Sequence, residues 1–506
     1  MNVFILTFYS CVLFSVSFGG TGDIFGDLWG DTKETFFNLF NKHPASRSLY
    51  EFLDLDINPC DNFYQFSCGK WIKTREKKWG NSGSFKYNHR TGNFDKFVNG
   101  NIFFVFIYLL SEVVNESKYK DESRIFSTFK NLRNKCSQEL PKDKVNNCLS
   151  EILEFGKYAL SSVFLRRNMR RIEKNGGYEK VQNMYKFINE QFRLLIDEKS
   201  EMFDLNTRKY FLQKIDSLKL VTSLDDYQLS NVKEMEDCYY RSIEIYYKDH
   251  ITTILASINN LKALSRNDDL TTCRGKIFQI DKFMYKFVYG NGMYVPYLNV
   301  FAINSDLVNE PSFSSDFPYS LNFGYLGNIM AHEMLHGFDS NNYNRTMANK
   351  ISDYKVSQIS VDNYEKKASC FVEQYNKQKE NITNRYIDGS KTLGENIADN
   401  GGLKVAHRAY LKFREVFNLK NVPVEGFEQF NDEQLFFISV GRNFCKYMSK
   451  DILEKEIIRD SHTPPEIRTN VLLSNYKPFS DAFNCPLNSK MNPEHKCELW
   501  KIKKQN

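Results

Sequence analysis

Residues 332–336 read His-Glu-Met-Leu-His, and this segment restricts the possible folds more than any other part of the chain. On an α-helix, residues four apart lie on one face, so the imidazoles of His332 and His336 can reach one metal ion. Glu333 lies further round the helix, where it can meet a water on that ion without binding the ion. Because the chain has only 8 histidines in 506 residues, chance gives this spacing on the order of once in a hundred. We therefore expect a helix that carries a zinc site.

A second segment, residues 394–402, offers the third protein ligand that a catalytic zinc site needs besides an open position. It reads GENIADNGG, and its Glu395 and Asp399 are four residues apart, hence on one face of a helix. We expect Glu395 to bind the metal and Asp399 to accept a hydrogen bond from a ligand histidine, which fixes the tautomer of that histidine. Taken alone, the segment also fits the polar start of a helix. Together with His-Glu-Met-Leu-His, it favours a metal site.

The two segments, extended to HEMLHGFDS and GENIADNGGLKVAHRAY, resemble the neprilysin and endothelin-converting-enzyme family of zinc peptidases. Further matching segments, in the same order, are PCDNFYQFSCGKWI at 59–72, TRKYFLQKIDSLKLVTSL at 207–224, SLNFG at 320–324, and SHTPPEIRTNVLLSN, AFNCP and MNPEHKCELW near the end. The resemblance therefore covers most of the chain. It implies a thermolysin-like (gluzincin) catalytic lobe, a helical lobe, and one Zn²⁺ per chain.

The resemblance also implies roles for single residues around the metal. His332, His336 and Glu395 match the zinc ligands. Glu333 matches the general base that takes a proton from water and passes it to the leaving amine. Asp399 matches the carboxylate that orients the first histidine.

The resemblance further implies residues that contact the substrate. His462 matches a histidine that stabilises the tetrahedral oxyanion, and Arg468 matches an arginine that holds the substrate carbonyl. Asn291 and Gly292 match the pair that binds the substrate backbone, although Gly292 and Met293 stand where the family has Ala and Tyr. The wall of the pocket just after the cut is expected to comprise Ile329 and Phe444. Cleavage is therefore expected before a bulky apolar residue.

The apolar pattern predicts a mainly α-helical protein with a small β-sheet beside the metal helix. Between residues 101 and 264, apolar side chains recur at three- and four-residue spacing, which favours helices. Residues 290–324 contain three prolines and short apolar runs, which favour strands and loops. Helices are expected again around 325–338 and 395–415. The expected division is a signal peptide at 1–20, an N-terminal segment at 21–58, the N-terminal part of the peptidase at 59–136, a reduced helical lobe at 137–275 and a zinc-binding catalytic lobe at 276–506.

The helical lobe is expected to be reduced because only eleven residues separate Cys136 from Cys148. In the family, the stretch between the cysteines that these resemble is far longer. It builds much of a lobe that caps the catalytic cavity and admits only short peptides. A shorter stretch predicts a more open site that larger polypeptides can enter.

The N-terminus reads as a secretory signal. Residues 3–18 are almost entirely apolar and are followed by the small residues Gly19, Gly20 and Thr21. About sixteen residues is short for a membrane span. Cleavage would leave no membrane span, whereas the alternative is an uncleaved signal-anchor. A second apolar run, Phe103–Leu110, is also too short to span and is expected to be a buried helix.

Cysteine usage agrees with export. Beyond Cys11 in the signal, ten cysteines remain, an even number that suits up to five disulfides in an oxidising compartment. None forms a Cys-x-x-Cys pair, which disfavours a cysteine zinc site. The resemblance implies the pairs Cys60–Cys485, Cys68–Cys445, Cys136–Cys148 and Cys370–Cys497, which leaves Cys238 with Cys273. Glycan acceptor sequons occur at Asn115, Asn344 and Asn381.

Charge excludes one class of partner. The net charge of +6 arises from 68 basic and 62 acidic residues without a dense basic stripe, so nucleic-acid binding has little support. The sequence predicts a secreted zinc metalloendopeptidase that acts on peptides or polypeptides. The alternative, from a different class, is a catalytically silent secreted protein that binds zinc or peptides on the same scaffold. A purely structural module would leave the catalytic residues unexplained.

Overall fold

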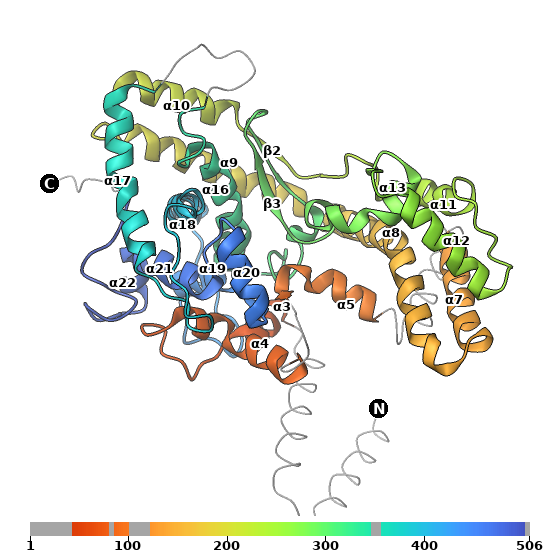
Figure 1. Ribbon diagram of the computed structural model, residues 1–506. Coiled ribbons are helices and arrows are strands. Elements are labelled where there is room, and N and C mark those ends of the chain that lie inside the picture. The colour runs from red at the N-terminus through yellow and green to blue at the C-terminus, as the bar shows by residue number, and fades with distance from the viewer. Residues whose placement is uncertain (1–42, 80–85, 101–121, 346–355, 501–506) are drawn as a thin grey trace, which may run out of the picture.

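The computed structural model describes residues 43–79, 86–100, 122–345 and 356–500. Within these ranges helices dominate and gather in two unequal lobes (Figure 1). Sheet is scarce: one sheet has two strands and the other has three. The prediction of a mainly α-helical fold with a small sheet is confirmed.

The metal-site motif lies on a helix inside the larger lobe. The chain runs through α15 (Tyr319–Asn322), a π-helical turn η5 (Phe323–Gly327) and α16 (Asn328–Leu335), and ends in a 3₁₀ turn η6 (His336–Phe338). Every residue of α16 is buried. Because a buried imidazole or carboxylate is costly without partners, the polar groups of this helix must be satisfied by their neighbours or by a ligand.

A second helix, α18 (Leu393–Val416), carries Glu395 and Asp399 and packs along α16. Two glycines allow the close approach. A Cβ atom at Gly402 would lie 2.8 Å from the backbone nitrogen of His332, and one at Gly401 would lie 2.7 Å from Nε1 of Trp500. Larger residues there would push the helices apart. The Gly-Gly pair of GENIADNGG therefore brings the two acidic side chains to the metal helix.

The three-stranded sheet lies beside α16. Its order is β2 (Lys219–Val221), β4 (Val300–Ile303) and β3 (Gly292–Val295), with β2 parallel and β3 antiparallel to the central strand. Phe301 pairs with Leu220 on one side and Tyr294 on the other. Since β3 pairs with β4 alone in the described part of the chain, its outer edge is available for an additional strand.

The larger apolar core joins segments that are distant in sequence. It buries side chains of α16 and α18, and also of helices that precede and follow them. These helices are α3 (Pro44–Phe52), α4 (Phe63–Trp79), α9 (Gly177–Asp197), α10 (Leu205–Ser217), α17 (Gln358–Asn376), α19 (Asp432–Arg442), α21 (Pro465–Ser474) and α22 (Lys477–Ala482). The two-stranded sheet adds a further link between the N-terminal and C-terminal regions, because β1 (Lys86–Asn88) pairs with β5 (Lys446–Met448).

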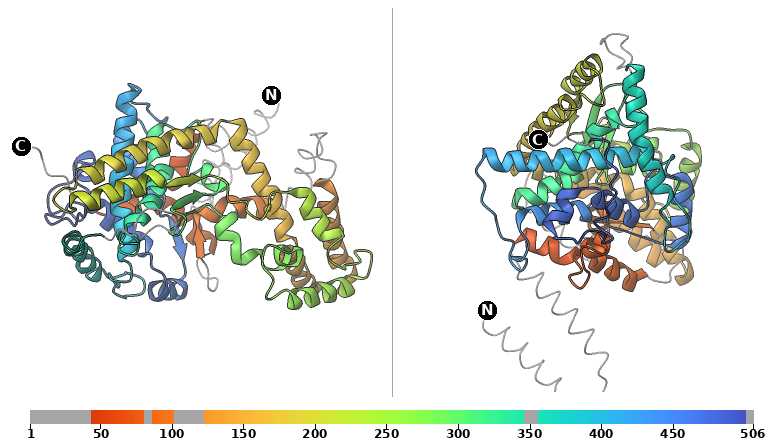
Figure 2. Two further views of the ribbon diagram at one scale, coloured as in Figure 1. Left: turned by 90° about the horizontal axis from the view of Figure 1, so that it is seen from above. Right: turned by 90° about the vertical axis from the view of Figure 1, so that its left-hand side faces the viewer.

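The smaller lobe has its own apolar core. Its helices are α7 (Glu122–Glu139), α8 (Lys142–Lys174), α11 (Val232–Tyr240), α12 (Ile251–Leu264) and α13 (Cys273–Phe278). The 33-residue α8 runs from this lobe back to the larger one, where α9 continues the chain (Figure 2). The predicted helical lobe, 137–275, is divided between the two cores. The buried side chains of α9 and α10 belong to the larger core, which also contains α16, and not to the core of the smaller lobe.

The remaining short elements connect these parts. On the N-terminal side they include η1 (His89–Thr91) and α5 (Gly92–Gly100), and after α13 they include η3 (Ile280–Phe283), α14 (Met284–Phe287) and η4 (Ser305–Val308). The prediction of strands and loops for 290–324 is confirmed by β3, β4 and the turns around them. β2 was missed, because its three residues lie in a region whose pattern favours helices.

Five disulfides are present: the four pairings that the resemblance implied, and Cys238–Cys273, the pair that these left. They are Cys60–Cys485, Cys68–Cys445, Cys136–Cys148, Cys238–Cys273 and Cys370–Cys497. The first two join α4 and the segment before it to the C-terminal part of the larger lobe. The third closes the α7–α8 hairpin.

Several sequence predictions fall outside the described residues: the signal peptide at 1–20, the apolar run Phe103–Leu110 and the sequon at Asn115. Asn344 and Asn381 are exposed, as glycan acceptors must be. Among the described helices, none has both the length and the apolar character needed to cross a membrane.

Candidate active site

A cleft of about 390 Å³ opens in the larger lobe along α16 and β3. Every residue that the sequence analysis assigned to metal, catalysis or substrate lines it. These residues are Asn291, Gly292, Ile329, His332, Glu333, His336, Glu395, Asp399, Phe444, His462 and Arg468. They come from segments almost 180 residues apart in the chain, and the fold brings all of them to one cavity.

Three side chains converge on one point in this cleft. His332 Nε2 lies 3.0 Å from His336 Nε2, and Glu395 Oε2 lies 3.4 Å and 3.7 Å from these two nitrogens. Ligands bound about 2.0–2.1 Å from a tetrahedral zinc lie about 3.3–3.4 Å from one another. Oε2 of Glu395 is buried, and its polar neighbours are His332, His336, His462 and Arg468 at 3.1–3.7 Å. The donor set and its spacing fit a zinc ion.

Each histidine is oriented by a different carboxylate. His332 Nδ1 lies 2.9 Å from Asp399 Oδ1, and His336 Nδ1 lies 2.7 Å from Asp339 Oδ2. Such contacts keep the hydrogen on Nδ1 and leave the Nε2 lone pair for a metal. Asp399 was predicted from the sequence. Asp339 was not, although its position three residues after His336 is a spacing at which helical side chains meet.

Asp399 is itself held by an arginine. Arg468 donates to it from Nε at 2.6 Å and from Nη2 at 2.7 Å, a two-pronged ion pair in which Asp399 is buried and Arg468 is largely covered. Burial alone raises the pKa of Asp399, but the charges of Arg468 and His332 reverse this and hold its pKa at about 2. The carboxylate therefore stays ionised. Arg468 was expected to hold the substrate carbonyl; in this structure its guanidinium binds Asp399.

His462 is a further neighbour of Glu395. Its Nε2 is 3.1 Å from Glu395 Oε2, and its Nδ1 is 2.7 Å from Asp460 Oδ1. The backbone N–H of His462 also donates to Asp460. Burial raises the pKa of Asp460, but these contacts with His462 lower it below its ordinary value. With its side chain 46% exposed, His462 is accessible to a molecule in the cleft.

The strand β3 forms one edge of the cleft next to Glu333. A Cβ atom at Gly292 would lie 3.0 Å from both Oε1 of Glu333 and Cγ2 of Ile329. Glu333, Ile329 and Gly292 on β3 are thus close neighbours in the cleft. An extended peptide that paired with this edge would pass directly in front of Glu333.

Two basic residues of the cleft were missed by the sequence analysis. Arg90 donates from Nη2 to Oδ1 of Asn443 at 2.5 Å, next to Phe444. Lys391 also lines the cleft and stands four residues before Glu395 in the sequence. Neither lies in a segment whose spacing points to metal or acid–base chemistry, so the sequence offered no signal for them.

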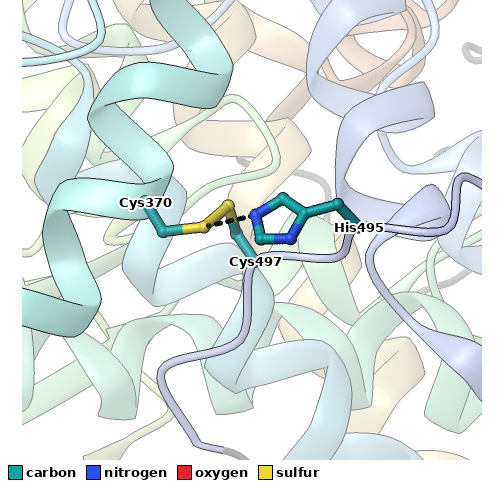
Figure 3. A group of neighbouring side chains, drawn as sticks. All are labelled: Cys370, His495 and Cys497. Atoms are coloured by element: carbon teal, nitrogen blue, oxygen red, sulfur yellow. Dashed lines mark hydrogen bonds between the residues drawn. A yellow bond between two sulfur atoms is a disulfide. The ribbon is translucent and has the colours of Figure 1, made fainter.

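A second group of possible metal ligands is not a metal site. Cys370, His495 and Cys497 lie together, and His495 Nε2 is 3.5 Å from Cys370 Sγ (Figure 3). The two sulfurs are joined in a disulfide, so neither is a thiolate that can bind a metal. The group of His332, His336 and Glu395 therefore stands as the candidate metal site of the described chain.

Comparison with known proteins points the same way. The profile described as Peptidase family M13 matches residues 291–499. An endothelin-converting enzyme homolog of Locusta migratoria is 30% identical over 359 residues, which cover 70% of this chain and 46% of that protein. Neprilysin-1 of Caenorhabditis elegans is 28% identical over 385 residues, which cover 76% and 48%. The chain thus spans less than half the length of these relatives.

Solved structures show the same fold at lower identity. A zinc metalloprotease of Mycobacterium tuberculosis in complex with an inhibitor has a TM-score of 0.50 at 17% identity, covering 72% of this chain and 52% of that one. The PEPO structure from Lactobacillus rhamnosis has a TM-score of 0.51 at 18% identity, covering 71% and 52%. The family implies a metal cofactor, typically zinc. Residues 291–499 thus match peptidase family M13, and the chain is similar over most of its length to an endothelin-converting enzyme homolog and to a neprilysin.

Proposed function

We propose that the chain is a zinc metalloendopeptidase with one Zn²⁺ held by His332, His336 and Glu395. The observation that carries this proposal is the convergence of three ligand atoms within 3.0–3.7 Å of one another, in the same cleft as Glu333. When bound there, zinc supplies Lewis-acid chemistry: it polarises a carbonyl and lowers the pKa of water. The match to peptidase family M13 supports the same activity.

The side chains around the metal supply the proton transfers. Glu333 takes a proton from the attacking water on its carboxylate and delivers it to the nitrogen of the leaving amine. His462 Nε2 donates a hydrogen bond to the carbonyl oxygen as negative charge develops on it, a contribution of roughly 3–4 kcal/mol for a well-placed donor. Asp460 keeps the ring of His462 turned toward the cleft through Nδ1.

The substrate binds as an extended strand along β3. Asn291 lies at the start of this edge and binds the substrate backbone with its amide, and Gly292 leaves space in front of Glu333. Arg468 holds the substrate carbonyl from the side of Asp399. Ile329 and Phe444 form the apolar wall after the cleaved bond, so cleavage occurs before bulky apolar residues.

The cleft accepts larger substrates than short peptides. None of its lining residues, within the described ranges, belongs to α7, α8, α11, α12 or α13 of the smaller lobe. That lobe therefore forms no part of the cleft wall, in keeping with the short stretch between Cys136 and Cys148. Polypeptides that are unfolded or have flexible loops are substrates on this view.

The protein functions outside the cell. Five disulfides favour an oxidising compartment, and exposed Asn344 and Asn381 are sites for glycans. The apolar residues 1–20 direct export as a cleaved signal, with a signal-anchor as the alternative. Mass spectrometry of the N-terminus of the exported protein distinguishes the two.

Digestion of a ten-residue peptide and of a reduced, unfolded protein tests the function and the size range together. We expect both to be cleaved, with Phe or Leu after the cut in most products mapped by mass spectrometry. Cleavage of the short peptide alone would contradict the open cleft and leave the peptidase activity intact. Binding of both without cleavage, by zinc-loaded protein, would favour the silent peptide-binding alternative.

A further inference from the structure

The helix α20 (Lys450–Arg459) directly precedes Ser461 and His462 of the cleft lining, and few of its side chains are buried. Of its ten residues, only Leu453 is buried. Directly after α20 the chain passes through Asp460 and reaches His462, which faces Glu395. The position of His462 therefore depends on the polar contacts that hold the end of this helix.

One such contact comes from the cleft. The Nζ atom of Lys391 donates a hydrogen bond to the carbonyl oxygen of Ile457, in the last turn of α20. The last carbonyls of a helix have no partner within the helix, and they carry the negative end of its dipole. A lysine ammonium both satisfies Ile457 and interacts favourably with this dipole. It ties the end of α20 to the segment that carries Glu395.

Lys391 is held in place by its own backbone. Its N–H and that of Ser390 each donate to Oδ1 of Asp388 at 3.0 Å, and two residues further on the chain enters α18. On the other side of His462, Thr463 donates from Oγ1 to Oδ1 of Asn396 at 2.9 Å, and both residues are buried. On either side of His462, the chain is thus hydrogen-bonded to the start of α18: Ile457 to Lys391, just before the helix, and Thr463 to Asn396, in its first turn.

We propose that Lys391 is a positioning residue whose bond to the end of α20 keeps His462 opposite Glu395. This inference rests on the proposed peptidase function, because the role of His462 is to meet charge that develops on a substrate oxygen. Lys391 acts through the backbone of α20 and contacts no reacting atom. Without Lys391, His462 keeps its contact with Asp460, and Thr463 keeps its hydrogen bond to Asn396. The distance between His462 and the metal site is then no longer fixed.

Steady-state kinetics with a central-Phe peptide test the proposal in the zinc-loaded protein. Lys391→Met is expected to lower kcat about tenfold with KM changed less than about twofold, since misplacing a group that acts in the transition state costs rate rather than binding. Lys391→Arg, which keeps a cationic donor, is expected to retain most of kcat. Lys455→Met, the same change on the exposed side of α20, is the matched control and is expected to leave kcat unchanged. A rise in KM at constant kcat would overturn the proposal and indicate direct substrate contact.

A double-mutant cycle tests whether Lys391 acts through His462. If Lys391 acts through His462, Lys391→Met changes kcat less than about twofold when it is added to His462→Ala. A full tenfold effect in that background would show that Lys391 acts on another group, and would overturn the proposal.

Hydrogen exchange provides a readout that does not require catalysis. In Lys391→Met, the amides of residues 457–462 are expected to exchange faster than in the wild type, and those of α16 at the wild-type rate. Unchanged exchange at 457–462 would overturn the proposal that Lys391 holds the end of α20, even in an active enzyme. A wild-type protein that binds zinc but cleaves nothing would refute the peptidase function. Hydrogen exchange at residues 457–462 would still test whether Lys391 holds the end of α20.

Discussion

The Nε2 atoms of His332 and His336 lie 3.0 Å apart, while each Nδ1 faces a different carboxylate. Because each Nδ1 keeps its hydrogen for Asp399 or Asp339, both Nε2 atoms present lone pairs to the same point. The arrangement fits two ligands of one metal ion.

Removal of Asp339 should weaken metal binding. Asp339→Ala deletes the acceptor that lies 2.7 Å from Nδ1 of His336 and fixes its tautomer. Loss of such a partner costs about 10–100-fold in metal affinity. Competition with a chromophoric chelator measures the change. Asp316→Ala, at an exposed carboxylate of the same lobe, is the control and should bind zinc as the wild type does. Equal affinity in both variants would show that Asp339 does not orient the ligand.

Removal of His462 should slow turnover without weakening substrate binding. His462→Ala is expected to lower kcat by about 10²–10³, the effect of losing one donor to a developing oxyanion. KM and zinc affinity should change little, because the three metal ligands remain. Stopped assays over a range of peptide concentrations separate kcat from KM. A variant with normal kcat would remove His462 from the catalytic group.

Protonation of His89 should destabilise the fold as the pH falls. His89 is buried; its Nδ1 contacts the carbonyl oxygen of Cys445 at 2.6 Å, so Nε2 must accept the hydrogen bond from the hydroxyl of Tyr325. Burial, aided by the charge of Arg90, lowers the pKa of His89 to about 3. Between about pH 6.5 and pH 3 the unfolded chain therefore binds a proton that the folded chain does not, so stability falls as the pH falls.

The test compares the free energy of unfolding of the wild type and His89→Asn from pH 7.5 to pH 4.5. The advantage of the wild type should shrink steadily below about pH 6.5, by at most about 3 kcal/mol at pH 4.5. Contributions from all other groups are common to both proteins and cancel in the difference. A constant difference for His89→Asn would mean that His89 is not held neutral.

The long disulfide should contribute more stability than the short one. Cys68–Cys445 closes a separation of 377 residues and Cys136–Cys148 one of 12, and all four cysteines are buried. In the chain-entropy relation the difference between loops of these lengths is roughly 3 kcal/mol. Paired Cys→Ala variants of each bridge, unfolded in guanidinium, provide matched measurements. A larger loss for the short bridge would mean that local strain or denatured-state structure outweighs loop entropy.

Local spacing predicted the centre of the site. The 3.6-residue period of the α-helix was enough to place His332, Glu333 and His336 together. The same period placed Glu395 and Asp399 on one face of a second helix. The resemblance supplied His462, Arg468 and the disulfide pairs, which lie in segments without a distinctive pattern of their own. The residues predicted from spacing, together with His462 and Arg468, all line one cleft.

Contacts between distant segments could not be predicted in this way. Arg90 meets Asn443 across about 350 residues, and Lys391 meets Ile457 through a side chain whose type is common on protein surfaces. The packing of α9 and α10 with the metal helix was also missed. An amphipathic pattern tells which face of a helix is buried, and it does not tell against which partner.

Hydrolysis of a quenched peptide with a central Phe, by wild-type protein and by Glu333→Gln at equal zinc occupancy, tests the central claim most directly. We expect one zinc per chain in both proteins. The wild type should be active, and a zinc chelator should abolish its activity. Glu333→Gln should lose at least about a hundredfold, since a general base contributes about 10²–10⁴ to the rate. Equal rates in the two proteins, or no hydrolysis by zinc-loaded wild type, would contradict a zinc peptidase with Glu333 as its base.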